Sequence, residues 1–316
     1  MTPETPSRAP AADALIQSIA SVIVGKDREI KLVVTCLLAE GHVLIEDVPG
    51  VGKTMLTRAL AGSIGGRNAR IQFTPDLLPS DVTGLSVFNQ KTQEFDFRPG
   101  PIFANVVLAD EINRAGPRTQ SALLEAMAEH QVTVDGSTRP LTTPFIVIAT
   151  QNPVELQGTY PLPEAQLDRF LMRLSIGYPT LEQEEEIVAR HSGRRPLQHL
   201  QPVCDLAGVE ELIAAAGRVQ VKQSLVRYMA TLCSATRTHP DVVLGASPRA
   251  TLGLHRAAQA WALLAGREFV TPDDVKTVVA PVLTHRLMLT HQAAFSGRSA
   301  GQVVADILAA TPIPPP

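Results

Sequence analysis

The first half of the chain alternates short apolar runs with longer stretches in which apolar residues recur at helical spacing. Four runs of four or five mostly apolar residues are bounded by turn-forming residues, at 43–46, 69–73, 105–109 and 145–149. Runs of this kind are typical of strands that are buried on both faces of a parallel sheet. The pattern therefore predicts an α/β fold in which helices cover both faces of the sheet.

The pattern changes near residue 178, after which the strand-like runs stop. Helical character then continues through successive segments, at 181–192, 205–217, 222–238, 248–265 and 272–288. Two of these segments begin with proline after a hydroxyl residue, an order that is typical of helix starts: Ser247-Pro248 and Thr271-Pro272. The sequence thus predicts an α/β core at 13–178 and an all-helical domain at 179–310.

Two hairpins are expected to interrupt the core. Residues 131–141 contain two alternating runs around Asp135-Gly136, which is a strong hairpin signal. The stretch at 84–100 is a weaker candidate. Both ends of the chain have the composition of loose segments, and we expect residues 1–12 and 311–316 to be disordered.

Composition narrows the class of protein. The chain has 316 residues, of which 45% are hydrophobic and 19% charged, as in folded proteins. Its formal net charge of −3 lacks the basic balance that is typical of nucleic-acid binders. The three cysteines are far apart, and neither a signal peptide nor a run of the roughly 20 apolar residues that span a bilayer is visible. We therefore expect a cytoplasmic protein without a membrane span.

A phosphate-binding pattern follows the first predicted strand. Seven residues there are expected to surround a bound nucleotide: Pro49, Gly50, Val51, Gly52, Lys53, Thr54 and Met55. The glycines let backbone N–H groups approach phosphate oxygens, helped by the positive end of the next helix. Lys53 is expected to reach the β- and γ-phosphates and Thr54 to bind Mg²⁺. The general pattern has glycine where this chain has Asp47, and a glycine-rich turn without a ligand is the alternative interpretation.

The third predicted strand ends in two adjacent carboxylates, Asp110 and Glu111. Phosphoryl transfer to water requires a fixed Mg²⁺ and a positioned water molecule. Asp110 is the natural partner of the metal, and Glu111 is the natural base that orients the water. Acidic residues at a strand end can also be merely solvated, but their position after the phosphate-binding loop favours the catalytic interpretation.

Three further polar residues are candidates for the same chemistry. Asn152 follows the fourth predicted strand, and strand ends in such a sheet face one crevice, although an Asn before Pro can also simply form a turn. Arg169 ends a short helix, and Arg249 opens a helix of the second domain. A guanidinium stabilises the charge that develops on the γ-phosphate, whereas most arginines are only solvated.

The combination of these motifs resembles AAA+ ATPases, and among them the MoxR family, over roughly residues 15–290. Four segments carry the resemblance, and the last is the most specific to this family: Glu46–Thr54, Asp110–Ala115, Ala149–Pro153 and Gly158–Phe170. The resemblance implies an AAA+ core with a helical lid, ATP and Mg²⁺ as ligands, and hydrolysis of ATP to ADP and phosphate. Asp47 also resembles the family's own pattern.

The resemblance implies a role for each candidate residue. Lys53 and Thr54 correspond to Walker A, Asp110 and Glu111 to Walker B, and Asn152 to sensor 1.

Residues outside the strand ends also gain expected roles. Arg169 resembles the arginine finger that reaches the nucleotide of a neighbouring subunit, and Arg249 resembles sensor 2 on the lid. Val24 and Gly25 resemble the segment that borders the adenine, and Arg114 is a further candidate for a contact across the interface. The two hairpins match insertions that approach the central pore in related rings.

The expected function is that of a chaperone-like remodeller that acts as a homo-oligomeric ring, with a hexamer as the family expectation. The resemblance implies a partner with a von Willebrand factor A domain, and roles in the maturation of protein complexes or in metal cofactor insertion. A nucleic-acid motor is the first alternative, but the hairpins are not net basic, as a translocating hairpin should be. A non-catalytic nucleotide switch is the second, and it is disfavoured because all hydrolytic groups are present.

Overall fold

The computed structural model describes residues 9–152, 159–191 and 196–313. Some of the expectations fall on residues outside these ranges. They are the outer parts of the two ends, at 1–8 and 314–316, and two residues of the motif segments, Pro153 and Gly158.

A five-stranded parallel sheet forms the centre of the core, in the order β2-β5-β8-β1-β9. Its strands are β1 (Val43–Glu46), β2 (Asn68–Gln72), β5 (Val106–Asp110), β8 (Ile146–Gln151) and β9 (Met172–Leu174). The first four lie within two residues of the predicted strands. The predicted α/β fold with a parallel sheet is therefore confirmed.

Successive side chains of the central strands enter two separate hydrophobic clusters, because strand side chains alternate between the two faces. On one face, Ile45 and Leu108 pack with helices α1 (Ala9–Ala20), α2 (Asp27–Leu38) and α3 (Lys53–Ser63). On the other face, Leu44 and Val107 pack with α5 (Pro117–Glu129), beside the short α4 (Pro79–Thr83). Both faces are thus buried, which explains the continuous apolar runs.

Helix α1 begins earlier than the sequence suggested. Ala12, Leu15 and Ile19 recur at helical spacing and are completely buried. The prediction of disorder for 1–12 is therefore wrong for residues 9–12, because the apolar face of the helix starts within them. At the other end, residues 311–313 follow the last helix and form no further element.

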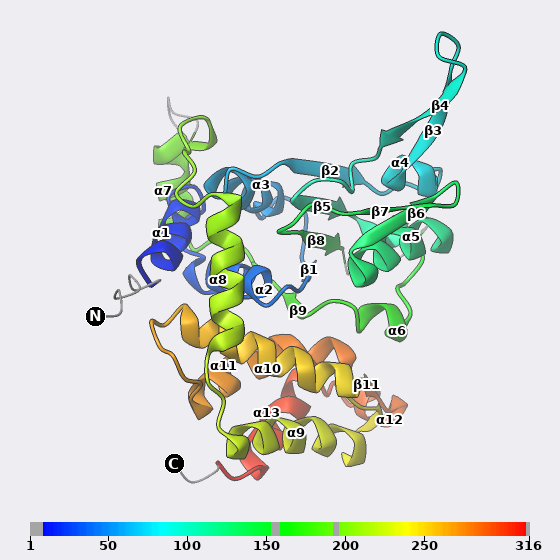
Figure 1. The fold of residues 1–316 in the computed structure, drawn as a ribbon. Coiled ribbons are helices and arrows are strands. Elements are labelled where there is room, and N and C mark those ends of the chain that lie inside the picture. Colours follow the sequence, from blue (N-terminus) through cyan, green and yellow to red (C-terminus); the bar gives the residue numbers. More distant parts are fainter. Residues whose placement is uncertain (1–8, 153–158, 192–195, 314–316) are drawn as a thin grey trace.

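The lid consists of helices, most of which lie below the core in Figure 1, while α8 stands upright beside α2. They are α8 (Leu206–Arg218), α9 (Gln223–Thr238), α10 (Pro248–Leu263), α11 (Pro272–Leu283), α12 (His291–Phe295) and α13 (Ala300–Ala310). The expectation of an all-helical domain is wrong in one detail, since β10 (Val242–Leu244) pairs with β11 (Met288–Leu289). The helix expected to reach residue 288 ends at Leu283 and continues as the 3-10 helix η3 (Thr284–Arg286).

Helix α7 (Leu181–His191) lies in the expected lid range but sits against the core. Figure 1 shows it beside α1, far from α9 to α13. Arg190 donates to the carbonyl of Ser21, and Gln183 donates to the carbonyl of Gly25. The spatial boundary between core and lid therefore follows α7 instead of preceding it.

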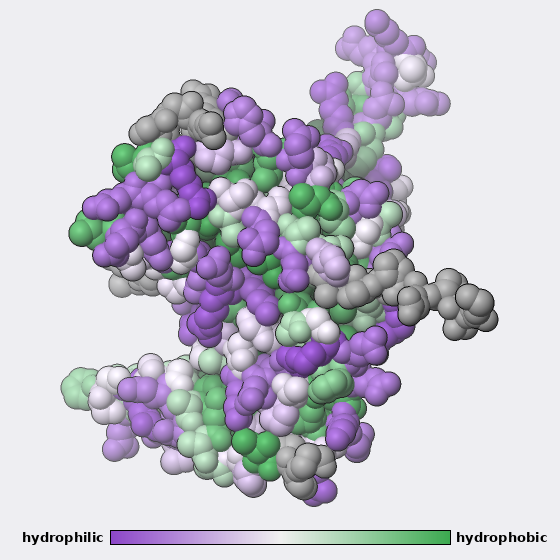
Figure 2. Space-filling model, turned by 90° about the vertical axis from the view of Figure 1, so that its left-hand side faces the viewer, coloured by the Kyte–Doolittle hydropathy of each residue, from purple (hydrophilic) through white to green (hydrophobic). Residues whose placement is uncertain are grey.

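Core and lid share one hydrophobic cluster. Leu254 and Ala257 of α10 are buried in the same cluster as Val33 and Leu37 of α2. Figure 2 shows the two parts as lobes with an indentation between them on the left of the view. None of the helices in the described ranges is long and apolar enough to cross a membrane.

Both expected hairpins form. The first joins β3 (Gly84–Asn89) to β4 (Glu94–Pro99), and the second joins β6 (Gln131–Val134) to β7 (Ser137–Pro140). The β3–β4 hairpin projects from the body in Figures 1 and 2. Near its tip, Phe88 and Phe95 are 51% and 72% exposed and pack edge to face at 5.3 Å.

Asp47 links the loop after β1 to the end of β9. Its Oδ2 accepts hydrogen bonds from the N–H groups of Ile176 and Gly177, both at 2.6 Å, and from the hydroxyl of Ser175 at 3.2 Å. Its Oδ1 accepts from the N–H of Val48 at 2.9 Å. The carboxylate that departs from the general phosphate-binding pattern therefore has a structural use.

We predict that Asp47→Ala lowers the free energy of unfolding by about 3 kcal/mol, because it leaves one buried and two partly buried N–H groups without an acceptor. Burial alone would raise the pKa of Asp47, but the hydrogen bonds from Gly177, Val48, Ile176 and Ser175 hold it below its usual value. A lowered folded-state pKa means that this stabilisation is complete above about pH 4 and is lost as the pH falls through the folded-state value.

Denaturant unfolding at neutral and acidic pH tests this prediction. The difference between wild type and Asp47→Ala should shrink as the solution is acidified below about pH 4. Asp205→Ala is a matched control, because Asp205 only caps α8 by accepting from the N–H of Gly208, and its loss should cost about 1 kcal/mol. A loss in Asp47→Ala no larger than in the control would contradict the structural use of Asp47.

Candidate active site

The loop between β1 and α3 has the backbone that phosphate binding requires. Gly50 and Gly52 have φ angles of +87° and +91°, which residues with a Cβ rarely adopt. A Cβ at either position would meet no atom within 4 Å, so open space lies beside the loop. Helix α3 begins at Lys53 directly after Gly52, and its N-terminus therefore faces this space.

The carboxyl ends of β1, β5 and β8 meet at this loop, because the three strands are parallel neighbours. A cavity of about 400 Å³ lies there. Its lining contains nine of the residues that the sequence singled out, together with three that it did not: Pro49, Gly50, Gly52, Lys53, Thr54, Met55, Arg70, Gln72, Asp110, Glu111, Thr150 and Asn152. Of the loop residues predicted to contact nucleotide, Val51 alone is absent from this lining.

Asp110 lines this cavity and is held by two partners. The hydroxyl of Thr150 donates to its Oδ1 at 2.6 Å, and Arg70 of the edge strand β2 donates to its Oδ2 at 2.7 Å. The ammonium of Lys53 donates to the carbonyl of Asp47 at 3.0 Å. Burial lowers the pKa of Lys53, and the nearby carboxylates of Asp110, Asp47 and Glu111 oppose that effect.

These groups fit a nucleotide with Mg²⁺. The hydroxyl of Thr54 and the carboxylate of Asp110 offer the oxygen ligands that Mg²⁺ prefers, and Mg²⁺ commonly takes its remaining ligands from phosphates and water. The guanidinium of Arg70 already places a positive charge against Asp110. Among the described residues, no group of three or more His, Cys, Asp or Glu side chains is arranged to hold a metal ion. Mg²⁺ at this site would therefore need ligands from the nucleotide and water.

Glu111 is restrained in an unusual backbone conformation. Its φ angle is +57°, which is uncommon for a residue with a side chain and is frequent at functional sites. Its N–H donates to Thr150 at 2.9 Å. Its Oε2 accepts hydrogen bonds from Gln72 at 2.9 Å and from Arg114 at 3.0 Å. The structure therefore places Arg114 against the carboxylate of its own chain.

Val24 and Gly25 lie apart from the lining of this cavity. Val24 is buried, and Gly25 has a φ angle of +67° and accepts from Gln183 of α7. Their expected position beside an adenine stays a prediction.

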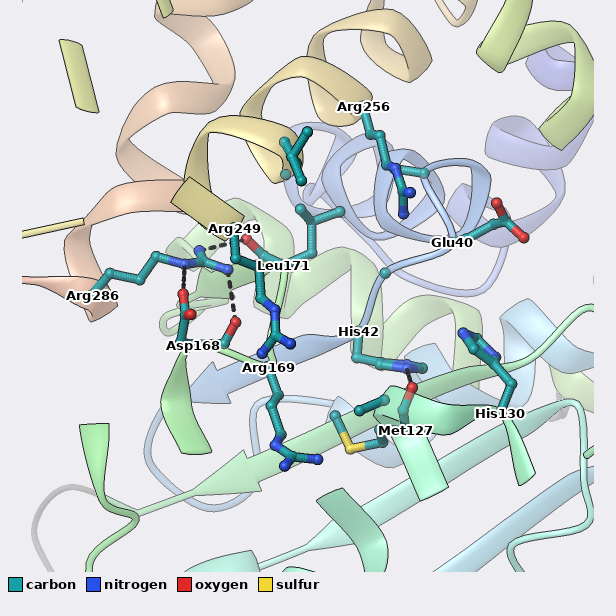
Figure 3. A pocket seen from close by; sticks show the side chains of 15 residues that line it. Glu40, His42, Met127, His130, Asp168, Arg169, Leu171, Arg249, Arg256 and Arg286 are labelled. Atoms are coloured by element: carbon teal, nitrogen blue, oxygen red, sulfur yellow. Dashed lines mark hydrogen bonds and ion pairs between the residues drawn. The ribbon is translucent and has the colours of Figure 1, made fainter. Parts of the chain in front are cut away.

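A second cavity, of about 270 Å³, contains the other candidate arginines. Figure 3 shows Arg169 and Arg249 pointing into it, with Arg256 and Arg286 nearby. Its lining and that of the first cavity have no residue in common. Arg169 donates to the carbonyl of Leu124 at 2.6 Å.

The two cavities lie at opposite ends of the sheet. His42, which precedes β1, lines the arginine cavity, whereas the phosphate-binding loop follows β1. β1 has four residues and is therefore about 13 Å long. Arg169 precedes β9, which is parallel to β1 and in register with it from Val43 and Met172 onward.

The expected role of Arg249 as sensor 2 stays a prediction, and the structure separates this residue from the phosphate-binding loop of its own chain. Arg249 lies beside Arg169, beyond the far end of β1 from the phosphate-binding loop. The reason is the packing of α10 against α2, which brings the start of α10 to the amino ends of the strands.

Arg70, Gln72 and Thr150 are the residues of the first cavity that the sequence analysis missed. Arg70 and Gln72 alternate on β2, so both side chains point to the same face near its carboxyl end. Thr150 precedes Asn152 at the end of β8. Polar residues at the carboxyl ends of the predicted strands were the available signal.

Comparison with known proteins places the chain in a family. The model of the ATPase family associated with various cellular activities (AAA) matches residues 42–172, and that of the AAA lid domain matches 234–307. The chain is 52% identical over 305 residues to the uncharacterized protein YeaC of Bacillus subtilis, across 96% of this chain and 95% of that protein. It is 44% identical over 310 residues to Chaperone MoxR1 of Mycobacterium tuberculosis, across 95% and 81%.

A crystal structure of a candidate ATPase from Cytophaga hutchinsonii superposes with a TM-score of 0.92 at 39% identity, covering 98% of this chain and 96% of that one. The family match and the phosphate-binding loop agree with the resemblance that the motifs indicated. The chain is a nucleotide-binding ATPase and belongs to the MoxR family of AAA+ proteins.

Proposed function

We propose that this ATPase works as a homo-oligomeric ring, with six subunits as the family expectation, and remodels protein complexes. One observation carries the ring. Arg169 and Arg249 lie at the opposite end of the sheet from the loop of their own chain. A neighbouring subunit whose loop faces this cavity would receive both guanidinium groups, and each active site would then consist of residues from two chains.

The residues of the first cavity divide the work of hydrolysis. The loop N–H groups and Lys53 bind the β- and γ-phosphates. Bound Mg²⁺, held by Thr54 and Asp110, would neutralise phosphate charge. Glu111 orients the attacking water and accepts its proton, after exchanging a contact with Gln72 or Arg114 for that water. Asn152, which follows β8 and lines the same cavity, would bond the water or a γ-phosphate oxygen.

The arginines of the neighbour supply charge only when the ring is assembled. Negative charge spreads over the γ-phosphate oxygens during transfer, and an arginine provided in trans accelerates related reactions by about 10³-fold or more. Since one of the two arginines belongs to the core and the other to the lid, the ring site also depends on the angle between these parts.

The β3–β4 hairpin favours a polypeptide as the client. Its tip exposes the paired rings of Phe88 and Phe95, which offer apolar area to a chain passing nearby. The charges of the hairpin are mixed, with Lys91 and Arg98 against Glu94 and Asp96. A relative named Chaperone MoxR1 supports a protein client. We further propose that the protein acts in the maturation of complexes or in metal cofactor insertion. Its partner would contain a von Willebrand factor A domain, as the family resemblance implies.

We predict that Lys53→Ala abolishes nucleotide binding and that Glu111→Gln retains it but hydrolyses ATP at least about 100-fold more slowly. Binding of a fluorescent ATP analogue and phosphate release by the two variants measure this. Normal turnover by Glu111→Gln would show that Glu111 is not the base.

We predict that Arg169→Ala and Arg249→Ala each bind ATP with unchanged affinity but turn over slowly, by about 10²-fold or more for Arg169. Mixing Arg169→Ala with Lys53→Ala should restore part of the activity, because intact loops of the first variant then meet intact arginines of the second. Phosphate release from mixtures at fixed total protein measures this. If mixing restores no activity, the arginines do not act in trans.

We predict that Phe88→Ala with Phe95→Ala weakens binding of a labelled unfolded polypeptide by about tenfold or more, the factor expected for lost apolar burial of two rings. Lys91→Ala at the same tip is the matched control and should leave polypeptide binding unchanged. If Lys91→Ala instead weakens binding of single-stranded DNA and the aromatic variants retain polypeptide binding, the nucleic-acid motor is the better interpretation.

A further inference from the structure

Asp168 connects the core to two separate segments of the lid. Its Oδ1 accepts a hydrogen bond from Nε of Arg286 at 2.7 Å, and its Oδ2 accepts one from the hydroxyl of Ser247 at 2.9 Å. Arg286 belongs to η3 and Ser247 precedes α10, so 38 positions of sequence separate the two donors that meet on one carboxylate. Figure 3 shows the ion pair of Arg286 with Asp168 at the edge of the arginine cavity.

Arg286 fixes the backbone on both sides of Arg169. Its side chain is only 3% exposed, and it donates to the carbonyls of Asp168 at 3.2 Å, Phe170 at 2.6 Å and Leu171 at 3.1 Å. A buried guanidinium with this many acceptors has little freedom to move. The segment that presents Arg169 is therefore held by the lid and not by the core alone.

Ser247 uses its hydroxyl in an unusual way. It occupies the N-cap position of α10, where a serine ordinarily accepts a hydrogen bond from the first turn of its own helix. Its side chain forms no such cap. Three other lid helices show the ordinary use, since Thr271 caps α11, Thr290 caps α12 and Ser299 caps α13. The hydroxyl of Ser247 binds the core instead.

The contact lies next to both arginines that are proposed to act in trans. Arg169 follows Asp168 directly, and Arg249 is two positions after Ser247. The hydrogen bond from Ser247 to Asp168 therefore sets the distance between a core segment that carries one guanidinium and a lid helix that carries the other.

We propose that Asp168 and Ser247 are positioning residues that hold Arg169 and Arg249 at one fixed spacing, so that the two guanidinium groups reach a neighbour's γ-phosphate together. This inference rests on the proposed function of the two arginines in trans. The contact between core and lid then determines how far Arg169 lies from Arg249. A lid that tilts away from the core would move the two arginines apart.

Ser247→Ala is the informative variant. It removes the tether but no helix cap, and water can replace the hydroxyl because the Asp168 side chain is 21% exposed. Asp168→Ala would instead leave the Arg286 guanidinium buried without its counter-charge, so it is expected to lose folded protein.

We expect Ser247→Ala to lower kcat by up to about tenfold, the factor that corresponds to one hydrogen bond, while KM for ATP, nucleotide affinity and ring assembly stay unchanged. Ser247→Thr keeps the hydroxyl and should restore kcat. Ser299→Ala is the matched control, because it removes a serine that caps a lid helix: it should lower the melting temperature and leave kcat unchanged.

The double variant Ser247→Ala with Arg249→Ala shows whether the tether acts through the arginine. If it does, Ser247→Ala lowers kcat in the wild type and has no further effect once Arg249 is absent. An equal loss in both backgrounds, or normal kcat in Ser247→Ala, would overturn the inference. Those results leave the proposed function standing as long as Arg169→Ala and Arg249→Ala remain slow, whereas normal turnover by the two arginine variants would overturn the proposed function itself.

Discussion

The direction of the parallel sheet is the constraint on which the rest of the molecule depends. Its strands all run the same way, so all of their carboxyl ends lie at one end of the sheet and all of their amino ends lie at the other. The phosphate-binding loop, Asp110 and Asn152 lie at the carboxyl ends of their strands and therefore meet at the first of these two ends. Arg169 precedes a strand and lies at the second. A single chain therefore keeps its phosphate site and its arginines a full strand length apart, and a second copy is the simplest means of bringing them together.

The sequence predicted most residues at the carboxyl ends of the strands, because a local pattern identifies each of them. Gly52 and Lys53 follow one predicted strand, and Asp110 and Glu111 end another. This position alone predicts where they lie, because residues that follow buried parallel strands face the common crevice. The sheet and most helices could be predicted for a similar reason, since apolar periodicity is a local signal. The partners of Glu111 are only partly local, because Gln72 comes from an edge strand whose pairing with β5 had to be known first.

The sequence did not predict contacts between segments that are far apart in the chain. The place of Arg249 depends on how α10 packs against α2, and the place of α7 depends on backbone carbonyls near Ser21 and Gly25. Neither contact has a signature in the residues themselves. Asp47 was the opposite case: the sequence marked it as a departure from a pattern, but only the fold shows that its carboxylate binds N–H groups 129 and 130 positions away.

β9 directly connects the two ends of the sheet, because a segment of the proposed active site lies next to each of its ends. Beyond its carboxyl end, Ile176 and Gly177 donate to Asp47, which precedes the phosphate-binding loop. Before its amino end stand Asp168 and Arg169. The strand has only three residues, all of which pair with β1. The segment before β9 is in turn bound by the lid, since Asp168 accepts a hydrogen bond from Ser247. In the proposed ring, the loop of one subunit and the arginines that it would present to the next therefore lie at the two ends of one strand, and the contact of Ser247 with Asp168 would connect the second end to the lid.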